Sequence, residues 1–401
     1  MSYIKNPAGR LVAIDDPKDY VEWLEKKGFT KPTQEEVDHF VELKTAQIAA
    51  QKEAEKDANE LRLYLATVTG GPDGYGICAQ HLTEELLLKK VNVQRYFLNQ
   101  KVGILFHNPY SINRIETPYR MIYTMFESDK IPADWRDYLL AADKVLVPSE
   151  WCAKTFRRAG VEPVVVPLGY NHRKFTYIER EPKRPQRKNF TFLHYNAFNL
   201  RKGFLEVLKA FVKAFDKTEP VRMIFKTTLE NVPLSLPPQQ YPNIEIINGR
   251  TNDDNLVDII KRSDAFVFPS RGEGFGIPPL ECMATGMPVI VPNAHGITEY
   301  FNADYMYEAK VAETCPGIYS RYKGVDTGKM VVCDVDQLAQ QMRWIYEHED
   351  EARAKGKAAS EYVKNWTFEK TAQKLIPLIE EGNKLAKERS RLKNTLVLEK
   401  V

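Results

Sequence analysis

The fold is decided by residues 263–301, which read SDAFVFPSRGEGFGIPPLECMATGMPVIVPNAHGITEYF. An apolar run comes first, a glycine-bearing loop then holds Glu273, and Glu281 follows eight residues later inside a predicted helix. Open parallel sheets bind their ligands at loops of this kind, beyond the carboxyl ends of the strands. Gly274 and Gly276 allow backbone N–H groups to approach a ligand closely, and the N-terminus of the next helix favours an anion. The two carboxylates therefore mark a candidate functional site.

Short apolar runs alternate with helical stretches on both sides of this segment, which is typical of βαβ units and a parallel sheet. The first series of predicted strands lies within residues 61–69, 102–106, 120–126, 144–148 and 163–167. The second series lies within residues 190–195, 221–227, 244–248, 265–269 and 288–292. Helices are expected at residues 77–90, 150–159, 204–215, 255–263 and 278–286. The predicted fold class is α/β with two Rossmann-like domains.

The remaining segments complete the predicted domain organisation. A capping box, Thr33-x-x-Glu36, opens a long run of helix formers within residues 1–60, which we interpret as a helical N-terminal extension. The polar stretch 171–189 shows no periodicity and is the expected linker. We therefore predict an extension (1–60), a first domain (61–170), the linker (171–189), a second domain (190–366) and a C-terminal helix (367–401) that packs back on the first domain.

Composition excludes several classes of protein. The 401 residues carry 57 basic and 54 acidic side chains, a net charge of +3, so a strongly cationic nucleic-acid binder is not indicated. The five cysteines are scattered without C-x-x-C spacing, which favours buried free thiols over disulfides or a zinc site. Neither a signal peptide nor a membrane-spanning stretch is apparent, so a cytoplasmic location is expected.

Three segments together resemble one known family. Residues 266–290, with FVFPSRGEGFG and ECMATGMPVI, look like the E-x7-E motif of retaining GT-B glycosyltransferases of family-four type. Residues 121–161, MIYTMFESDKIPADWRDYLLAADKVLVPSEWCAKTFRRAGV, and residues 199–211, NLRKGFLEVLKAF, resemble two further segments of that family. The resemblance covers residues 61–390. It implies a GT-B fold, in which an acceptor domain and a nucleotide-sugar donor domain face a cleft.

The resemblance also implies roles for individual donor-site residues. Glu273 would contact the transferred sugar and act as a catalytic residue, and Glu281 would hold the ribose hydroxyls of the nucleotide. Lys202 of the R-K-G segment would neutralise the leaving diphosphate, a case of electrostatic stabilisation in the transition state. The backbone of three consecutive residues would contact the diphosphate: Phe275, Gly276 and Ile277.

Further residues are assigned to the donor and acceptor by the same resemblance. Gly76, which heads the helix after the turn GGPDGYG, would approach the donor phosphate across the cleft, while Arg250 and Thr251 would lie near the nucleotide base. Asp73 and Tyr75 are acceptor-binding candidates, although a plain strand-to-helix turn explains them equally well. His107 is a third acceptor candidate, and its alternative is a structural loop histidine. His194 and His295 lie near donor segments.

Two positions depart from the family pattern. Relatives often carry an arginine where this chain has Asn196, and Arg201 could supply the missing charge in the donor site. Many relatives carry a histidine at the position of Glu127. Glu127 is therefore a candidate for orienting or deprotonating the acceptor hydroxyl, with a structural partnership to Lys130 or to a nearby backbone amide as the alternative.

The resulting prediction is a metal-independent, retaining glycosyltransferase of the hexosyltransferase type, without a cofactor, that uses a UDP- or GDP-sugar. The acceptor could be a glycan, a protein or modified DNA. One alternative is a phage-encoded DNA-base glycosyltransferase whose basic linker residues contact phosphates: Arg173, Lys174, Lys183, Arg184, Arg187 and Lys188. An alternative from another class is a non-catalytic scaffold that binds nucleotide-sugar without turnover.

Overall fold

The computed structural model describes residues 2–5, 11–14, 33–35, 37–38, 61–67, 74–180, 189–228, 241–249 and 251–398. Residues 1–60 and 61–401 form two compact units. In the first unit, strand β1 (Ser2–Lys5) pairs antiparallel with β2 (Leu11–Ile14). The capping box expected at Thr33 and Glu36 includes Glu36, which lies outside the described residues.

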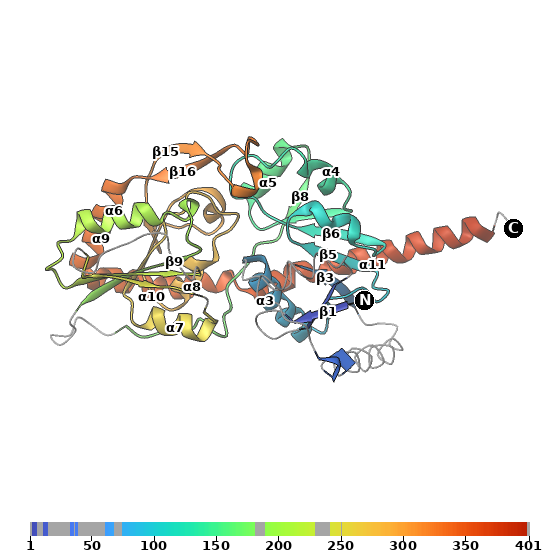
Figure 1. The fold of residues 1–401 in the computed structure, drawn as a ribbon, viewed down its shortest axis with the longest axis horizontal. Coiled ribbons are helices and arrows are strands. Elements are labelled where there is room, and N and C mark those ends of the chain that lie inside the picture. The colour runs from blue at the N-terminus through green and yellow to red at the C-terminus, as the bar shows by residue number, and fades with distance from the viewer. Residues whose placement is uncertain are drawn as a thin grey trace. The chain divides into compact units, whose positions relative to one another are not determined.

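The second unit begins with a six-stranded parallel sheet in the order β4-β3-β5-β6-β7-β8. Its strands are β3 (Arg62–Ala66), β4 (Asn92–Gln94), β5 (Val102–Phe106), β6 (Tyr119–Tyr123), β7 (Lys144–Val147) and β8 (Pro163–Val165). Its helices are α3 (Gly74–Leu88), α4 (Trp135–Leu140) and α5 (Glu150–Arg158). This sheet and its helices form the first half of the unit (Figure 1).

The second half contains another six-stranded parallel sheet in the order β11-β10-β9-β12-β13-β14. Its strands are β9 (Phe190–Asn196), β10 (Val221–Thr227), β11 (Ile244–Ile247), β12 (Ala265–Val267), β13 (Val289–Val291) and β14 (Tyr307–Glu308). Its helices are α6 (Phe204–Ala214), α7 (Asp253–Lys261) and α8 (Ile277–Ala284). The α/β fold class and the paired Rossmann-like halves are thus confirmed.

The apolar runs form strands because both faces of each sheet are covered. In β5, Ile104 and Phe106 belong to one buried cluster while Leu105 between them belongs to another. In β9, Phe192 and Leu193 divide between two clusters in the same way. Alternate side chains of a strand point to opposite faces, so continuous apolar runs are needed here.

The chain crosses between the two halves twice, and the two crossings lie side by side. Tyr170 donates its N–H to the carbonyl oxygen of Trp366 (3.0 Å), and Phe368 donates back to the carbonyl oxygen of Tyr170 (3.2 Å). Gly169 lies so close to the returning strand that an added Cβ would be 2.1 Å from the carbonyl carbon of Thr367. The two crossings are therefore tightly packed against each other.

Three helices follow the second sheet: α9 (Val335–Glu347), α10 (Glu349–Tyr362) and α11 (Phe368–Leu398). The last of them lies within the C-terminal helix expected at residues 367–401. Helix α11 starts after the second crossing and contacts α3, β5 and β6 of the first half (Figure 1).

The sequence did not predict the antiparallel hairpin of β15 (Val311–Pro316) and β16 (Lys329–Cys333). Most side chains of β15 are exposed, so the strand lacks the apolar run that identifies a buried strand. The loop between the two strands extends to the first half near α4 and α5 (Figure 1). There, Tyr322 accepts a hydrogen bond from the indole N–H of Trp135 (3.2 Å).

Two smaller expectations can be compared with the structure. All five cysteines are free thiols, but Cys315 on β15 is only partly buried, whereas the other four are buried as expected. Within the described ranges, no helix combines the length and the apolar character needed to cross a membrane.

Replacing Gly169 by Ala should destabilise the second unit by about 1–3 kcal/mol, because the new methyl group overlaps the backbone of Thr367. Urea unfolding of the full chain measures this change. Gly74→Ala is the matched control, since nothing lies within 4 Å of a Cβ there. If Gly169→Ala unfolds at the same urea concentration as the wild type, the crossings are more loosely packed than described.

Candidate functional site

A cluster of four charged side chains lies between the two halves. The Lys202 ammonium lies 2.6 Å from one carboxylate oxygen of Glu273, and the Arg201 guanidinium lies 3.5 Å from the other. Arg201 also lies 3.4 Å from the carboxylate of Glu127, which follows β6 in the first half. The hydroxyl of Ser270 donates a hydrogen bond to Glu273 (2.6 Å). Arg201 thus connects two carboxylates that come from different halves.

Local backbone structure places the two cations. Arg201 and Lys202 end a short 3-10 turn, Leu200–Lys202, and the side chain of Asn199 accepts a hydrogen bond from the Lys202 N–H. Gly203 follows with φ of 76°, and a Cβ there would lie 2.3 Å from the carbonyl oxygen of Pro269. Only glycine tolerates both the positive φ and the close approach, so this residue sets the position of the cations beside the Glu273 loop.

The charges in the cluster shift one another's pKa values. Burial alone would raise the pKa of Glu273, but Lys202 and Arg201 outweigh it and lower that pKa to about 2. Burial lowers the pKa of Lys202, with Glu273 opposing the shift. For Arg201, burial acts to lower the pKa, but Glu127 and Glu273 outweigh it and raise the pKa. Glu273 is therefore ionised at neutral pH and its charge is compensated by cations.

The loop after Glu273 offers backbone donors. Gly276 has φ of 90° and precedes α8, whose second and third residues are prolines that lack an N–H. Within the described part of the chain, the N–H groups of Phe275, Gly276 and Ile277 donate to no acceptor. The Phe275 ring is buried and packs on Tyr300. The Phe275 side chain is thus used in packing, while the three backbone N–H groups stay available as donors.

Glu281 lies one turn inside α8, and its carboxylate accepts a hydrogen bond from the hydroxyl of Tyr195 at the end of β9. The Tyr195 hydroxyl is also 3.0 Å from the carbonyl oxygen of Pro278. Burial raises the pKa of Glu281 to about 8; the hydrogen bond from Tyr195 lowers it and nearby Asp253 raises it. The Glu281 carboxyl is therefore mostly protonated at neutral pH, and hydrogen-bond donors that approach it favour its charged form.

Gly272 and Gly274 serve a purpose that the sequence reasoning did not identify. A Cβ on Gly272 would lie 2.0 Å from the carbonyl oxygen of Glu127, and one on Gly274 would lie 2.6 Å from the Cβ of Met125. In addition, the Ser149 hydroxyl donates to the carbonyl oxygen of Gly274 (2.8 Å). These glycines therefore allow the second half to contact the first, and Gly274 is not explained by ligand access alone.

Tyr319 is a site residue that the sequence reasoning missed. It lies on the hairpin loop, and its hydroxyl is 3.2 Å from the hydroxyl oxygen of Ser128. Burial, followed by the neighbouring Glu127 carboxylate, raises its pKa. Its ring packs on Phe126, with ring centroids 4.9 Å apart. Because the contact joins distant parts of the chain, no local sequence signal could have revealed it.

The structure contradicts the expected alternative pairing of Glu127 with Lys130. Lys130 pairs with Asp326 of the hairpin loop (2.6 Å), and Glu127 lies beside Arg201 instead. Arg201 therefore belongs to the ion cluster, as the cation between Glu127 and Glu273. The side-chain nitrogen of Asn196 is buried and has no hydrogen-bond partner among the described residues.

The acceptor candidates of the first half are only partly brought together. The Tyr75 hydroxyl is 3.3 Å from the Thr124 hydroxyl and hydrogen bonds to the backbone of Met125, so Tyr75 supports the end of β6. The rings of Tyr75 and His107 are neighbours, with centroids 5.0 Å apart. Gly76 lies in the first turn of α3. Asp73 lies outside the described residues.

The remaining candidates lie at the second sheet. Arg250 is outside the described residues, and exposed Thr251 lies just before the N-cap of α7. His194 and His295 are buried, and each is hydrogen-bonded to a carbonyl oxygen, that of Val267 and that of Ser270 respectively. Burial lowers the pKa of both histidines to about 4. Both are therefore neutral at physiological pH.

Two of the six basic linker residues have acidic partners. Arg173 forms an ion pair with Glu85 of α3 (2.6 Å), and Lys174 forms one with Asp254 of α7 (2.7 Å). The other four lie outside the described residues. These pairs connect the two halves and reduce the positive charge that the linker could offer to DNA.

Comparison with known proteins agrees with this architecture. Residues 177–362 match the family model of glycosyl transferases group 1. The structure is similar to sucrose-phosphate synthase from Thermosynechococcus elongatus, with a TM-score of 0.61, 15% identity and coverage of 80% of this chain and 98% of that one. It is also similar to Anabaena HepE in complex with UDP-glucose, with a TM-score of 0.58, 12% identity and coverage of 80% and 99%.

The sequence is 23% identical over 224 residues to ORF313 of Acidianus filamentous virus 1, a match that covers 54% of this chain. The chain spans 64% of the length of that relative. The fold is therefore GT-B, and residues 177–362 are similar to glycosyl transferases group 1.

Lowering the pH should destabilise the folded wild-type chain, because protonation of Glu273 removes its ion pairs. Its pKa is about 2 in the folded chain against an ordinary value of 4.5, so the stabilisation is present above 4.5 and is lost as pH falls through that interval. Glu273→Gln should lower the free energy of unfolding at neutral pH by about 3–5 kcal/mol, because it leaves the buried Lys202 ammonium without a carboxylate partner. It should also lose less stability than the wild type in acid.

Urea unfolding from about pH 7 down to about pH 3 tests both parts of this expectation. The matched control is Glu380→Gln, which removes an exposed carboxylate on α11. Parallel curves for Glu273→Gln and the wild type would contradict the assigned role of the ion cluster.

Proposed function

We propose that this protein transfers a sugar from a nucleoside diphosphate sugar to an acceptor hydroxyl with retention of configuration. The observation that carries the proposal is the pairing of Lys202 and Arg201 with Glu273, next to a turn whose N–H groups have no acceptor among the described residues. Such a site presents cations and backbone dipoles to the charge that develops on a leaving diphosphate.

In this proposal the diphosphate binds at the N–H groups of residues 275–277 and is neutralised by Lys202. Charge complementarity supports this placement, since the N-terminus of α8 carries a partial positive charge. The unpartnered amide of Asn196 lies at the end of β9 and is a further donor for the same ligand. Glu281 binds the ribose hydroxyls, with Tyr195 holding its carboxylate in place.

The chemical step exchanges one bond at the anomeric carbon for another. The bond to the diphosphate oxygen breaks, the acceptor oxygen bonds on the same face, and the acceptor proton passes to the departing phosphate oxygen. Glu273 lies beside the reacting carbon and steadies its developing positive charge. Glu127 holds Arg201 and orients the acceptor hydroxyl. The proposed step uses no metal and no cofactor.

Glu273→Ala should reduce transfer by about 100- to 1000-fold, the usual cost of removing a group that acts in the transition state, while nucleotide binding is largely kept. Nucleotide release from a panel of UDP- and GDP-sugars measures the rate, and calorimetry measures binding. Glu380→Gln is the control. Full transfer by Glu273→Ala would disprove its catalytic role, and donor binding without turnover by the wild type would favour a non-catalytic scaffold.

UDP-glucose should bind more tightly as the pH rises towards about 8, the pKa of Glu281, because ribose hydroxyls donate to the charged carboxylate. Glu281→Gln should weaken binding by about 10- to 100-fold at alkaline pH and remove this pH dependence. Calorimetry at pH values up to about 8 tests this, because the diphosphate diester of UDP-glucose does not titrate in that range. Unchanged pH dependence in the variant would disprove the role of Glu281.

A further inference from the structure

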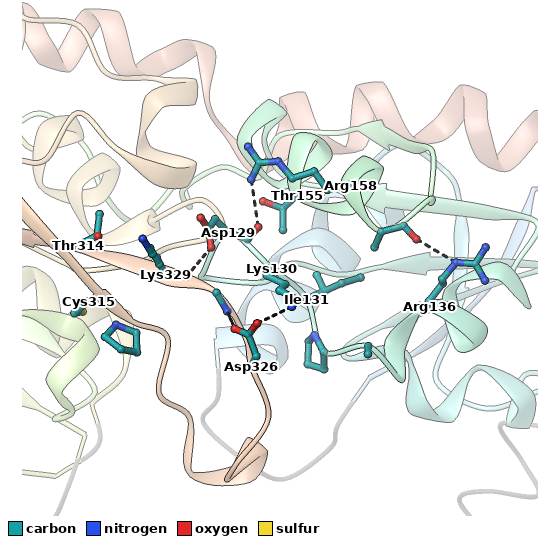
Figure 2. A pocket seen from close by; sticks show the side chains of 15 residues that line it. Asp129, Lys130, Ile131, Arg136, Thr155, Arg158, Thr314, Cys315, Asp326 and Lys329 are labelled. Atoms are coloured by element: carbon teal, nitrogen blue, oxygen red, sulfur yellow. Dashed lines mark hydrogen bonds and ion pairs between the residues drawn. The ribbon is translucent and has the colours of Figure 1, made fainter.

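A cavity of about 940 Å³ lies beneath the hairpin, separate from the ion cluster. Its walls come from the loop after Glu127, from α4 and α5, and from both hairpin strands (Figure 2). Six charged side chains line it: Asp129, Lys130, Arg136, Arg158, Asp326 and Lys329. Four of them are basic and two are acidic, so the lining carries an excess of positive charge.

Both acidic groups are occupied by structural contacts. The carboxylate of Asp129 accepts a hydrogen bond from the backbone N–H of Lys329 (2.6 Å). The carboxylate of Asp326 pairs with the Lys130 ammonium (2.6 Å) and accepts a hydrogen bond from the N–H of Gly328 (2.9 Å). These contacts hold the hairpin to the first half, and they use one of the four cations.

The other cations have weaker partners. Arg158 donates to the backbone carbonyl oxygen of Asp129 (3.3 Å), and Arg136 donates to that of Ala159 (3.2 Å) and lies 3.8 Å from exposed Asp137. The Lys329 ammonium has no partner among the described residues. Two cations, Arg158 and Lys329, thus lack a carboxylate partner at the cavity.

The apolar part of the lining and the location of the cavity indicate a binding site for a substrate. Ile131, Pro132 and Pro316 provide an apolar wall, and ligand sites commonly combine such a surface with a few polar groups. Asp129 follows Glu127 by two residues, so their Cα atoms are at most about 7 Å apart. The lining of the cavity therefore begins two residues after Glu127, the residue that we assign to the acceptor hydroxyl.

We propose that this cavity binds an anionic oxygen group, such as a phosphate, carried by the acceptor. Arg158 and Lys329 contact the anion, and the apolar wall contacts the body of the same molecule. The acceptor is then an acidic sugar or a phosphorylated molecule. This assignment of the acceptor rests on the proposed function. Anion binding itself requires only the cavity.

The test uses the full chain with UDP at saturating concentration, so that phosphate does not report on the donor site. Calorimetry measures the binding of inorganic phosphate, glucose 6-phosphate and glucose. Saturable binding of both phosphates is expected, with glucose 6-phosphate the tighter and glucose undetected. Lys329→Gln should weaken phosphate binding by about tenfold, and Arg158→Gln should act in the same direction.

Two exposed lysines that do not line the cavity provide matched controls, Lys323 for Lys329 and Lys154 for Arg158. Lys323→Gln and Lys154→Gln should bind phosphate as the wild type does. The proposal is overturned if phosphate does not saturate, or if the controls lose as much affinity as the cavity variants. Inorganic phosphate binding as tightly as glucose 6-phosphate would identify a free anion as the ligand and overturn the acceptor assignment.

The experiment separates two results: whether the donor site binds UDP, and whether the cavity binds an anion. If UDP does not bind, the donor-site assignment fails. The same phosphate titrations, comparing Lys329→Gln with Lys323→Gln, still decide whether the cavity binds an anion.

Discussion

The buried carboxylate of Glu273 needs compensating charge, and this requirement organises the centre of the structure. A carboxylate removed from water is costly unless cations and hydrogen-bond donors surround it. Lys202, Arg201 and Ser270 provide them, and Arg201 extends the network to Glu127 in the first half. The compensation of one charge therefore depends on the 3-10 turn after β9, the loop after β12 and the end of β6 together.

Backbone packing allows this electrostatic network to form. Gly272 and Gly274 bring the Glu273 loop against the first half, and Gly203 brings the cations against the base of the same loop. A side chain at any of the three would separate elements whose charged groups must lie within ion-pair distance. Small residues and charged residues thus act together, and the result is a densely packed network of ion pairs between the two halves.

Much of the fold could be predicted because its strands are buried on both faces. The apolar run at residues 102–106 and the largely apolar stretch at residues 221–227 match β5 and β10, and the helices between strands follow from their periodicity. The hairpin of β15 and β16 could not be predicted in this way, since exposed side chains carry no burial pattern. As a consequence, Tyr319 and the cavity beneath the hairpin were not foreseen either.

The sequence by itself determined the alternating α/β order, the glycine-bearing loop and the presence of Glu273, Glu281 and Lys202 near one sheet edge. These features are local, because they depend on burial periodicity and on residue types at short spacing. Only the tertiary structure decided that Arg201 joins Glu127 to Glu273, that Lys130 pairs with Asp326, and that Gly274 packs against Met125. These contacts join residues far apart in the chain. Which side chains pair depends on how close the fold brings them and on the compensation of buried charge.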